Sequence, residues 1–322
     1  MDNLTINSTI NISADGATEV KYTVIIDAVL LLTVMFGIVY NLLVIAVLIV
    51  NSDIVRSIRW ILGNVLAAGA MGALGSALLH ILRVLEVLTA GHRSYGLAVC
   101  KVSLSLIGVG NSGRVLLATF YAISVFVVVR WWNKPVLAPK YTKYFIIATV
   151  VVWLLVAPLV VPSLVTNVSE FCSMPTNDEE TYSGIYSVIP YFILSTLPII
   201  LTLLLLIVTV CFIRKRTITE NSAGRKALLR FGFFLVIGQG INAIGQIVCP
   251  AVFLVLSTHR DRSLAAMTLT AIFDLSLIPT PILICIFFKP VQLKLRNWFC
   301  CCCARCSAEA TASTQGTTQQ IL

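Results

Sequence analysis

Hydrophobic residues fill seven long stretches of the chain, and polar residues gather between these stretches. Each stretch is long enough to cross a ~30 Å hydrocarbon core as a helix, which takes about 20 residues. Backbone polar groups in lipid must be satisfied internally, so runs of this length are predicted to be α-helices. The seven runs cover residues 23–50, 60–84, 98–129, 144–166, 186–213, 230–257 and 265–288.

The pattern predicts an all-α membrane protein, namely a seven-transmembrane helix bundle at residues 23–288. A short amphipathic eighth helix follows at residues 289–299, where Val291, Leu295 and Trp298 recur at helical spacing among cations. Residues 1–22 precede the bundle as a polar segment, and residues 300–322 form a cysteine-rich and then disordered tail.

Composition supports this class. Hydrophobic residues make up 58% of the chain, charged residues 11%, and the mean hydropathy is +0.95, values that exclude a soluble globular domain. The net charge of +9 does not indicate a nucleic-acid partner, because the basic residues sit in the segments between apolar runs. We therefore expect the lipid bilayer, and no nucleic acid, as a partner.

Basic residues also predict the orientation. Sixteen of the 23 Lys and Arg fall after runs one, three and five or in the C-terminal tail, and six fall on the other side. This asymmetry predicts an extracellular N-terminus, a cytoplasmic C-terminus and a plasma-membrane location. Four glycosylation sequons agree with it, at Asn3, Asn7, Asn11 and Asn167.

Cysteines occupy two distinct settings. Cys100 and Cys172 both fall on the predicted outer face, where an oxidising compartment favours a disulfide between them; two free cysteines are the alternative. Five others follow the eighth helix and are candidates for S-palmitoylation, with a zinc cluster as the competing interpretation. These are Cys300, Cys301, Cys302, Cys303 and Cys306.

Two charges interrupt the apolar runs near mid-membrane. Arg114 lies sixteen residues before Arg130, and Asp274 lies fifteen before Lys289, so both sit ~22–24 Å from the inner ends of their helices. They either pair directly or meet separate polar partners, and each is expected to face the protein interior or a cavity. The ligand-binding candidates are Asn111, Arg114, Gln239, Asn242 and Asp274.

A further polar group lies at the outer end of the second run. His80, Arg83 and Glu86 recur every three residues. With Asp27, Tyr186 and Tyr191 they are interpreted either as the rim of a ligand entrance or as side chains that snorkel to the interface.

Together, the topology and several local motifs resemble the rhodopsin-like (class A) G-protein-coupled receptor family. Tyr40-Asn41-Leu42-Leu43-Val44 is similar to the GNxxV pattern of the first helix, Trp153 matches the fourth-helix tryptophan, and Pro198 matches the fifth-helix proline. Ala122-Ile123-Ser124-Val125 resembles the residues that precede the DRY motif. The resemblance spans residues 23–306 and implies a receptor coupled to heterotrimeric G proteins.

Four motifs of that family are altered, which makes this a divergent member by resemblance. Phe126-Val127-Val128 stands in place of DRY, and Gly69 in place of the sodium-binding aspartate. Ile237-Gly238-Gln239-Gly240 replaces CWxP, and Thr280-Pro281-Ile282-Leu283-Ile284 replaces NPxxY. The seventh run has no lysine for a retinal Schiff base, so no cofactor is expected. The expected G-protein-coupling region comprises Val127, Arg130, Arg214, Lys215 and Arg216.

Other functions fit less well. A non-signalling or decoy receptor of the same fold stays open, because the altered motifs bear on coupling. A small-molecule transporter is disfavoured by the lack of internal repeats. A zinc hydrolase, or any other enzyme, is not expected, because the three histidines lie near the outer ends of helices without an HExxH-like spacing.

Overall fold

The computed structural model describes residues 14–51, 56–89, 94–130, 142–159, 196–216 and 274–300, together with single positions between 234 and 244 and residues 271 and 272. Every regular element in this described part of the chain is helical. Three long helices come first: α1 at Ala14–Val50, α2 at Arg56–Thr89 and α3 at Ser94–Arg130.

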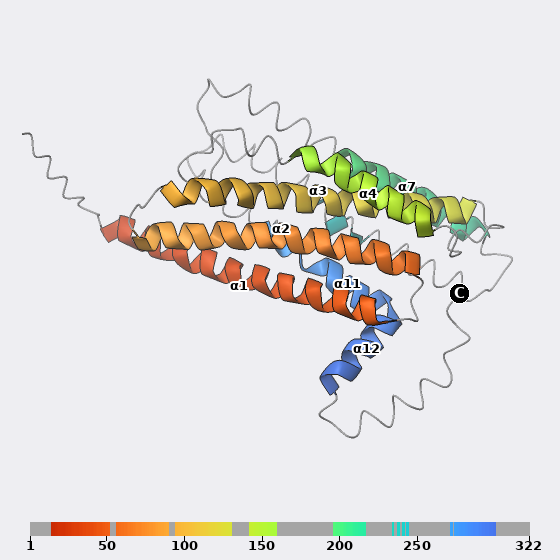
Figure 1. The fold of residues 1–322 in the computed structure, drawn as a ribbon, viewed down its shortest axis with the longest axis horizontal. Helices are drawn as coiled ribbons and strands as arrows, with labels where there is room; N and C mark the ends of the chain where they lie inside the picture. The colour runs from red at the N-terminus through yellow and green to blue at the C-terminus, as the bar shows by residue number, and fades with distance from the viewer. Residues whose placement is uncertain are drawn as a thin grey trace, which may run out of the picture.

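Shorter helices follow. α4 covers Thr142–Val156 and continues into the 3-10 turn η2 at Ala157–Leu159. α7 covers Leu197–Arg216, α11 covers Pro279–Phe287, and α12 covers Lys289–Cys300. α1, α2 and α3 run side by side along the long axis, and α12 leaves the bundle at one end (Figure 1).

Three helices are long and apolar enough to cross a membrane. These spans are Val24–Val50, Arg59–Leu85 and Ala98–Ile123, and the apolar segments Phe145–Val156 and Leu197–Cys211 are shorter within the described residues. The first three spans match the first three predicted runs, and the two shorter segments overlap the fourth and fifth runs, whose residues 160–166 and 186–195 lie outside the described residues. Most of the sixth run and part of the seventh lie outside the described residues, so the structure describes five of the seven predicted runs as substantial helices.

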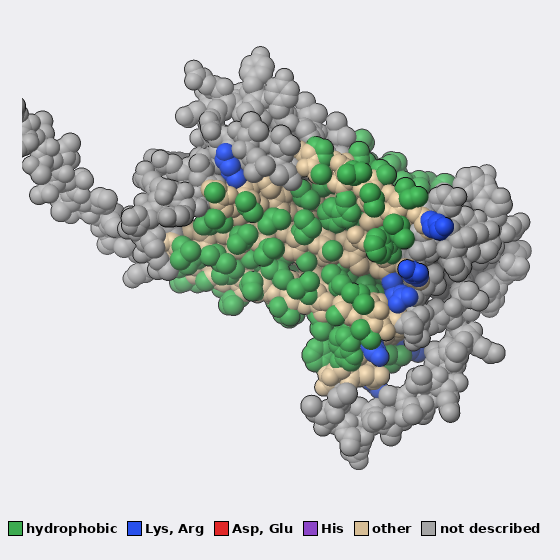
Figure 2. Space-filling view, viewed as in Figure 1, with side chains coloured by type: hydrophobic (Ala, Val, Ile, Leu, Met, Phe, Trp, Pro, Cys, Tyr) green, Lys and Arg blue, Asp and Glu red, His purple; other side chains and the backbone are tan. Residues whose placement is uncertain are grey.

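The outward face of the bundle is hydrophobic. Large apolar side chains such as Leu32, Ile49, Leu154 and Ile207 are exposed on α1, α4 and α7. Figure 2 shows this apolar belt, with most visible Lys and Arg side chains gathered near the end where α12 begins. An exposed apolar belt between charged ends is the surface of a protein that lies in lipid.

Glycines bring α2 and α3 into close contact. A Cβ added to Gly110 would lie 2.6 Å from the carbonyl oxygen of Ala68, and one added to Gly75 would lie 2.6 Å from that of Ser103. Any larger residue would therefore collide with the backbone of the neighbouring helix. This contact, the glycine seam of Gly72, Gly75 and Gly110, is the type of packing that small residues allow between membrane helices.

The chain breaks its helix just before α11. Residues 276–278 form a turn, in which Leu277 N donates to Asp274 O at 3.1 Å, and α11 begins at Pro279. Pro279 and Pro281 lack backbone N–H groups, so the i to i−4 ladder cannot continue through them. The break leaves the carbonyl of Ser276 available to a partner from another helix.

α12 packs against the C-terminal end of α1. Val291 and Leu295 are buried, whereas Trp298 and Phe299 on its other part are exposed. Asn51 Nδ2, just after α1, donates to the carbonyl of Pro290 at 3.2 Å. One apolar side of α12 therefore rests on the bundle, and the exposed aromatic side chains are placed as in an interfacial helix.

Candidate functional site

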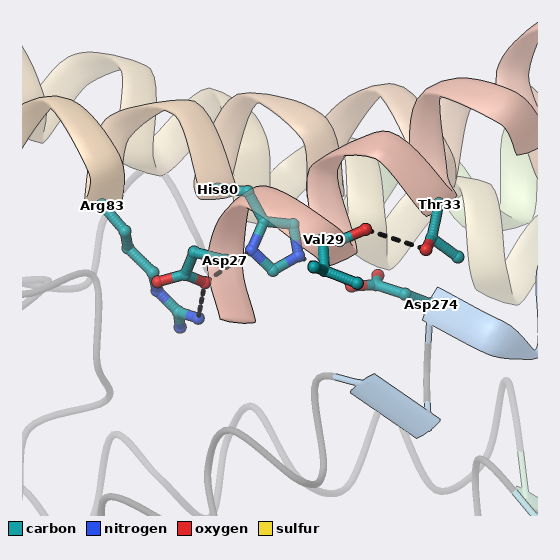
Figure 3. A network of polar contacts seen from close by, with 6 residues as sticks. All are labelled: Asp27, Val29, Thr33, His80, Arg83 and Asp274. Atoms are coloured by element: carbon teal, nitrogen blue, oxygen red, sulfur yellow. Dashed lines mark hydrogen bonds and ion pairs between the residues drawn. The ribbon is translucent and has the colours of Figure 1, made fainter. Parts of the chain in front are cut away.

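A buried histidine joins two carboxylates from distant parts of the chain. His80 Nδ1 lies 2.8 Å from Asp27 Oδ1, and His80 Nε2 lies 2.7 Å from Asp274 Oδ2. The exposed fraction of the His80 and Asp274 side chains is 0%, and that of Asp27 is 4%. Figure 3 shows the imidazole between the two carboxylates, which links α1, α2 and the segment before α11.

Arg83 extends this cluster toward its more exposed end. Its Nη1 lies 3.7 Å from the same Asp27 oxygen that faces His80, and its side chain is 26% exposed (Figure 3). Arg83 stands three residues after His80, so the two side chains emerge from neighbouring positions on one face of α2. We call Asp27, His80, Arg83 and Asp274 the acid–histidine cluster.

A second polar centre surrounds Arg114 on α3, whose side chain is only 1% exposed. Its Nη1 donates to the carbonyl of Ser276 at 2.8 Å, and its Nη2 donates to Asn111 Oδ1 at 3.0 Å and to Ser276 Oγ at 3.3 Å. Asn111 is three residues earlier on the same helix, where side chains are neighbours. The Ser276 carbonyl lies in the turn at residues 276–278.

The two mid-membrane charges meet separate partners. Among the described contacts, Asp274 binds His80, whereas Arg114 binds Asn111 and Ser276. Asp274 and Ser276 are two residues apart, and side chains at that spacing on a helical turn point in different directions. Equal depth therefore does not make them a pair, and the interpretation with separate partners is the one the structure supports.

Two polar atoms near these centres are buried and have no hydrogen-bond partner among the described residues: Asn111 Nδ2 and Asp274 Oδ1. Ser76 Oγ, one turn before His80 on α2, is a third. The amide is a donor, the carboxylate oxygen is an acceptor, and the hydroxyl is both. Buried groups of this kind require a partner, which a ligand group, an ordered water or a residue outside the described ranges can supply.

The interpretation of His80 and Asp27 as a solvent-facing rim, or as snorkelling side chains, is wrong. Both are buried inside the bundle. The sequence did contain a signal, since Gly72, Ser76 and His80 follow one another at i, i+4 spacing on α2. Because Gly72 lies against α3 and Leu277, the row that continues to His80 faces the interior.

Several site predictions fall outside the described residues. These are Gln239 and Asn242, the sequon residues Asn3, Asn7, Asn11 and Asn167, the cysteine Cys172, and the tail cysteines Cys301, Cys302, Cys303 and Cys306. Cys100 is buried and disulfide-bonded, and its pairing with Cys172 stays a prediction. Cys300 ends α12, Val127 and Arg130 lie in the last turns of α3, and Arg214, Lys215 and Arg216 end α7.

Motif residues of the first, second and fourth runs meet in space. A Cβ added to Gly69 would lie 3.3 Å from Asn41 Oδ1, so these two positions face each other. Asn41 itself donates to the carbonyl of Gly37 at 2.7 Å. Trp153 Nε1 donates to Asn64 Oδ1 at 3.1 Å, which ties α4 to α2.

Comparison of the whole fold with solved structures identifies its type. The crystal structure of squid rhodopsin matches with a TM-score of 0.70, over 94% of this chain and 93% of that chain, at 15% sequence identity. The chain has the rhodopsin fold. No protein-family model matches the sequence, and no curated protein matches it significantly. At this identity the likeness establishes the fold alone.

The rhodopsin fold and the apolar spans together make this a multi-pass membrane protein. Within that fold, the acid–histidine cluster connects α1, α2 and the segment before α11, and the Arg114 centre connects that segment to α3. Both centres bind residues 274–276. This short stretch is therefore the point at which the buried polar groups of three helices converge.

Proposed function

We propose that the protein is a seven-transmembrane receptor that binds an extracellular ligand within the outer half of the bundle and signals through heterotrimeric G proteins. The observation that carries the proposal is the match to the rhodopsin fold over 94% of the chain. Buried ionisable side chains within membrane helices support it, because their cost in lipid makes them functional candidates. In this proposal the N-terminus is extracellular, the C-terminus is cytoplasmic, and the protein resides in the plasma membrane.

The proposed ligand contacts are Asn111, Arg114, Gln239, Asn242 and Asp274. The buried Asn111 Nδ2 and Asp274 Oδ1 support this assignment, because each has no hydrogen-bond partner among the described residues. One atom donates and the other accepts, so a ligand that carries both an acceptor and an N–H donor satisfies them together. Arg114 holds Asn111 through its 3.0 Å bond and thereby orients the amide.

The proposed G-protein contact lies at the ends of α3 and α7. Val127, Arg130, Arg214, Lys215 and Arg216 belong to the last turns of these helices. Four of these five residues are basic, and their charge suits an acidic partner surface or anionic lipid.

A non-signalling or decoy receptor is the second candidate. Phe126-Val127-Val128 favours it, because the class A pattern that this chain resembles has an arginine where Val127 stands. Such a receptor keeps the ligand site and lacks the side chain that engages the G protein. A transporter is a weaker third candidate, which no described feature favours.

The test is nucleotide exchange on each G-protein class in cells that express the protein, measured with and without candidate ligands. We expect the wild type to raise exchange above cells without receptor, and Val127→Arg to raise it further. Val128→Arg is the matched control, since it adds the same charge one residue along, about 100° around the helix. Exchange that is seen with Val127→Arg and not with the wild type supports the decoy receptor. If neither the wild type nor Val127→Arg raises exchange on any G-protein class, signalling is rejected.

A further inference from the structure

The acid–histidine cluster holds more acceptors than its own hydrogens can satisfy. We infer that Asp27, His80 and Asp274 form a proton-binding site, which carries one proton taken from solvent when the cluster is closed. The ligand in this case is the proton itself. The inference goes beyond the proposed receptor function, because it requires neither a second ligand nor a G protein.

A count of hydrogens leads to this conclusion. Two N···O separations, 2.8 Å to Asp27 and 2.7 Å to Asp274, each require one hydrogen between the heavy atoms. A neutral imidazole carries one N–H and an ionised carboxylate carries none. One hydrogen is therefore missing, and a single bound proton supplies it. The count is the same whether that proton sits on His80 Nε2 or on Asp274 Oδ2.

The balance of charge agrees with the count. Two carboxylates, Arg83 and one added proton sum to zero, whereas without the proton the cluster carries a net charge of −1 in the bundle interior. Burial of an unbalanced charge there is costly. Among the described residues, Asp27 faces His80 from α1, Arg83 flanks it on α2, and Asp274 faces it from the segment before α11. On α3, Arg114 binds Asn111 and Ser276 instead.

Loss of the proton opens the cluster. A ring nitrogen lone pair would then face a carboxylate lone pair at 2.7–2.8 Å, with the His80 side chain 0% exposed to bulk solvent. The repulsion is relieved when α2 separates from α1 or from the segment that bears Asp274. Because the closed arrangement holds a proton that a solvated histidine releases near pH ~6.5, closure is favoured at low pH and lost as the pH rises.

Asp274→Asn is a decisive variant. Its amide N–H donates to His80 Nε2, so a neutral imidazole then makes both hydrogen bonds and no added proton is needed. Asp27→Asn works in the same way on Nδ1, and it serves if Asp274→Asn does not fold. Thr202→Val is the matched control, since it removes a buried hydrogen bond to Thr119 on α3 and one to the carbonyl of Pro198 within α7, without touching a titratable group.

The first measurement is the apparent melting temperature of the purified full chain in lipid nanodiscs between pH 6 and pH 9. We expect the wild type and Thr202→Val to lose about 2 °C per pH unit where one proton is released. The melting temperature of Asp274→Asn should fall far less per pH unit. An unchanged slope in a folded asparagine variant overturns the inference.

The second measurement is the ¹⁵N spectrum of the ring nitrogens of the three histidines, with His80 assigned from its loss in His80→Gln. At pH 7.5 we expect the Asp27–His80–Asp274 unit of the wild type to retain its extra proton, seen as two protonated ring nitrogens or as one strongly shared with a carboxylate. In Asp274→Asn, one ring nitrogen should lose its proton. An ordinary neutral imidazole in the wild type contradicts the site.

Discussion

The guanidinium of Arg114 donates to the backbone carbonyl of Ser276 at 2.8 Å, across 162 residues of sequence. The acceptor is a main-chain atom, made available because the helix breaks before Pro279. Replacement of the Ser276 side chain therefore leaves the strongest part of this contact in place. The position of Arg114 depends on the path of the backbone around residues 276–278.

The contact between Arg114 and Ser276 predicts unequal losses of stability when each residue is replaced. Arg114→Ala removes the three hydrogen bonds that its guanidinium donates to Ser276 and Asn111, leaves a cavity, and should cost about 3–5 kcal/mol of stability. Ser276→Ala removes the hydroxyl that accepts from Arg114 at 3.3 Å and should cost about 1 kcal/mol. Thermal unfolding of both variants under one condition measures the difference, and equal losses contradict the role given to the carbonyl.

The glycine seam predicts opposite signs for two substitutions on α3. Gly110→Ala places a Cβ 2.6 Å from the carbonyl oxygen of Ala68, so α2 and α3 must separate, at a cost of about 1–3 kcal/mol or more. Gly108→Ala meets no atom within 4 Å and should stabilise the helix by about 1 kcal/mol. A melting temperature of Gly110→Ala at or above that of the wild type would show that the seam is not tight.

The bond between Trp153 and Asn64 predicts energetic coupling between α4 and α2. Trp153→Phe and Asn64→Leu each remove one partner of the 3.1 Å hydrogen bond. The loss in the double variant should be smaller than the sum of the single losses by about 0.5–1.5 kcal/mol. A double-mutant cycle on unfolding free energies measures this term, and strict additivity means that the two side chains act independently.

α12 is predicted to depend on a small buried contact. Val291→Asp places a charge in the position that is 0% exposed and should release α12 from the bundle. Gln292→Asp adds the same charge at the next position, which is exposed, and should have little effect. A spin label at Phe299 reports the release as increased probe motion. Equal mobility in both variants would place the anchor elsewhere.

Much of the helical framework follows from the sequence. The apolar runs 23–50, 60–84 and 98–129 lie within α1, α2 and α3, because a run of this length in lipid must satisfy its own backbone. The closeness of Asn111 to Arg114 also follows, since residues three apart share a helix face, and the structure adds the hydrogen bond between them. Both predictions depend only on local geometry.

Partner choice between helices does not follow from the sequence alone. The depths of Arg114 and Asp274 are set by residue counts, but the direction of each side chain depends on how each helix is rotated against its neighbours. That rotation is fixed by packing, as in the contact of Gly72 with Leu277. The sequence alone therefore indicates an interfacial position for His80, whereas in the structure its ring is fully buried and joins two carboxylates.

The glycine seam also limits which parts of the molecule can change shape. With backbone against backbone at Gly75 and Gly110, α2 and α3 cannot slide or rotate past each other without collision. They behave as one rigid body. In a change of state that starts at residues 274–276, labels placed on α2 and α3 should therefore keep a constant separation.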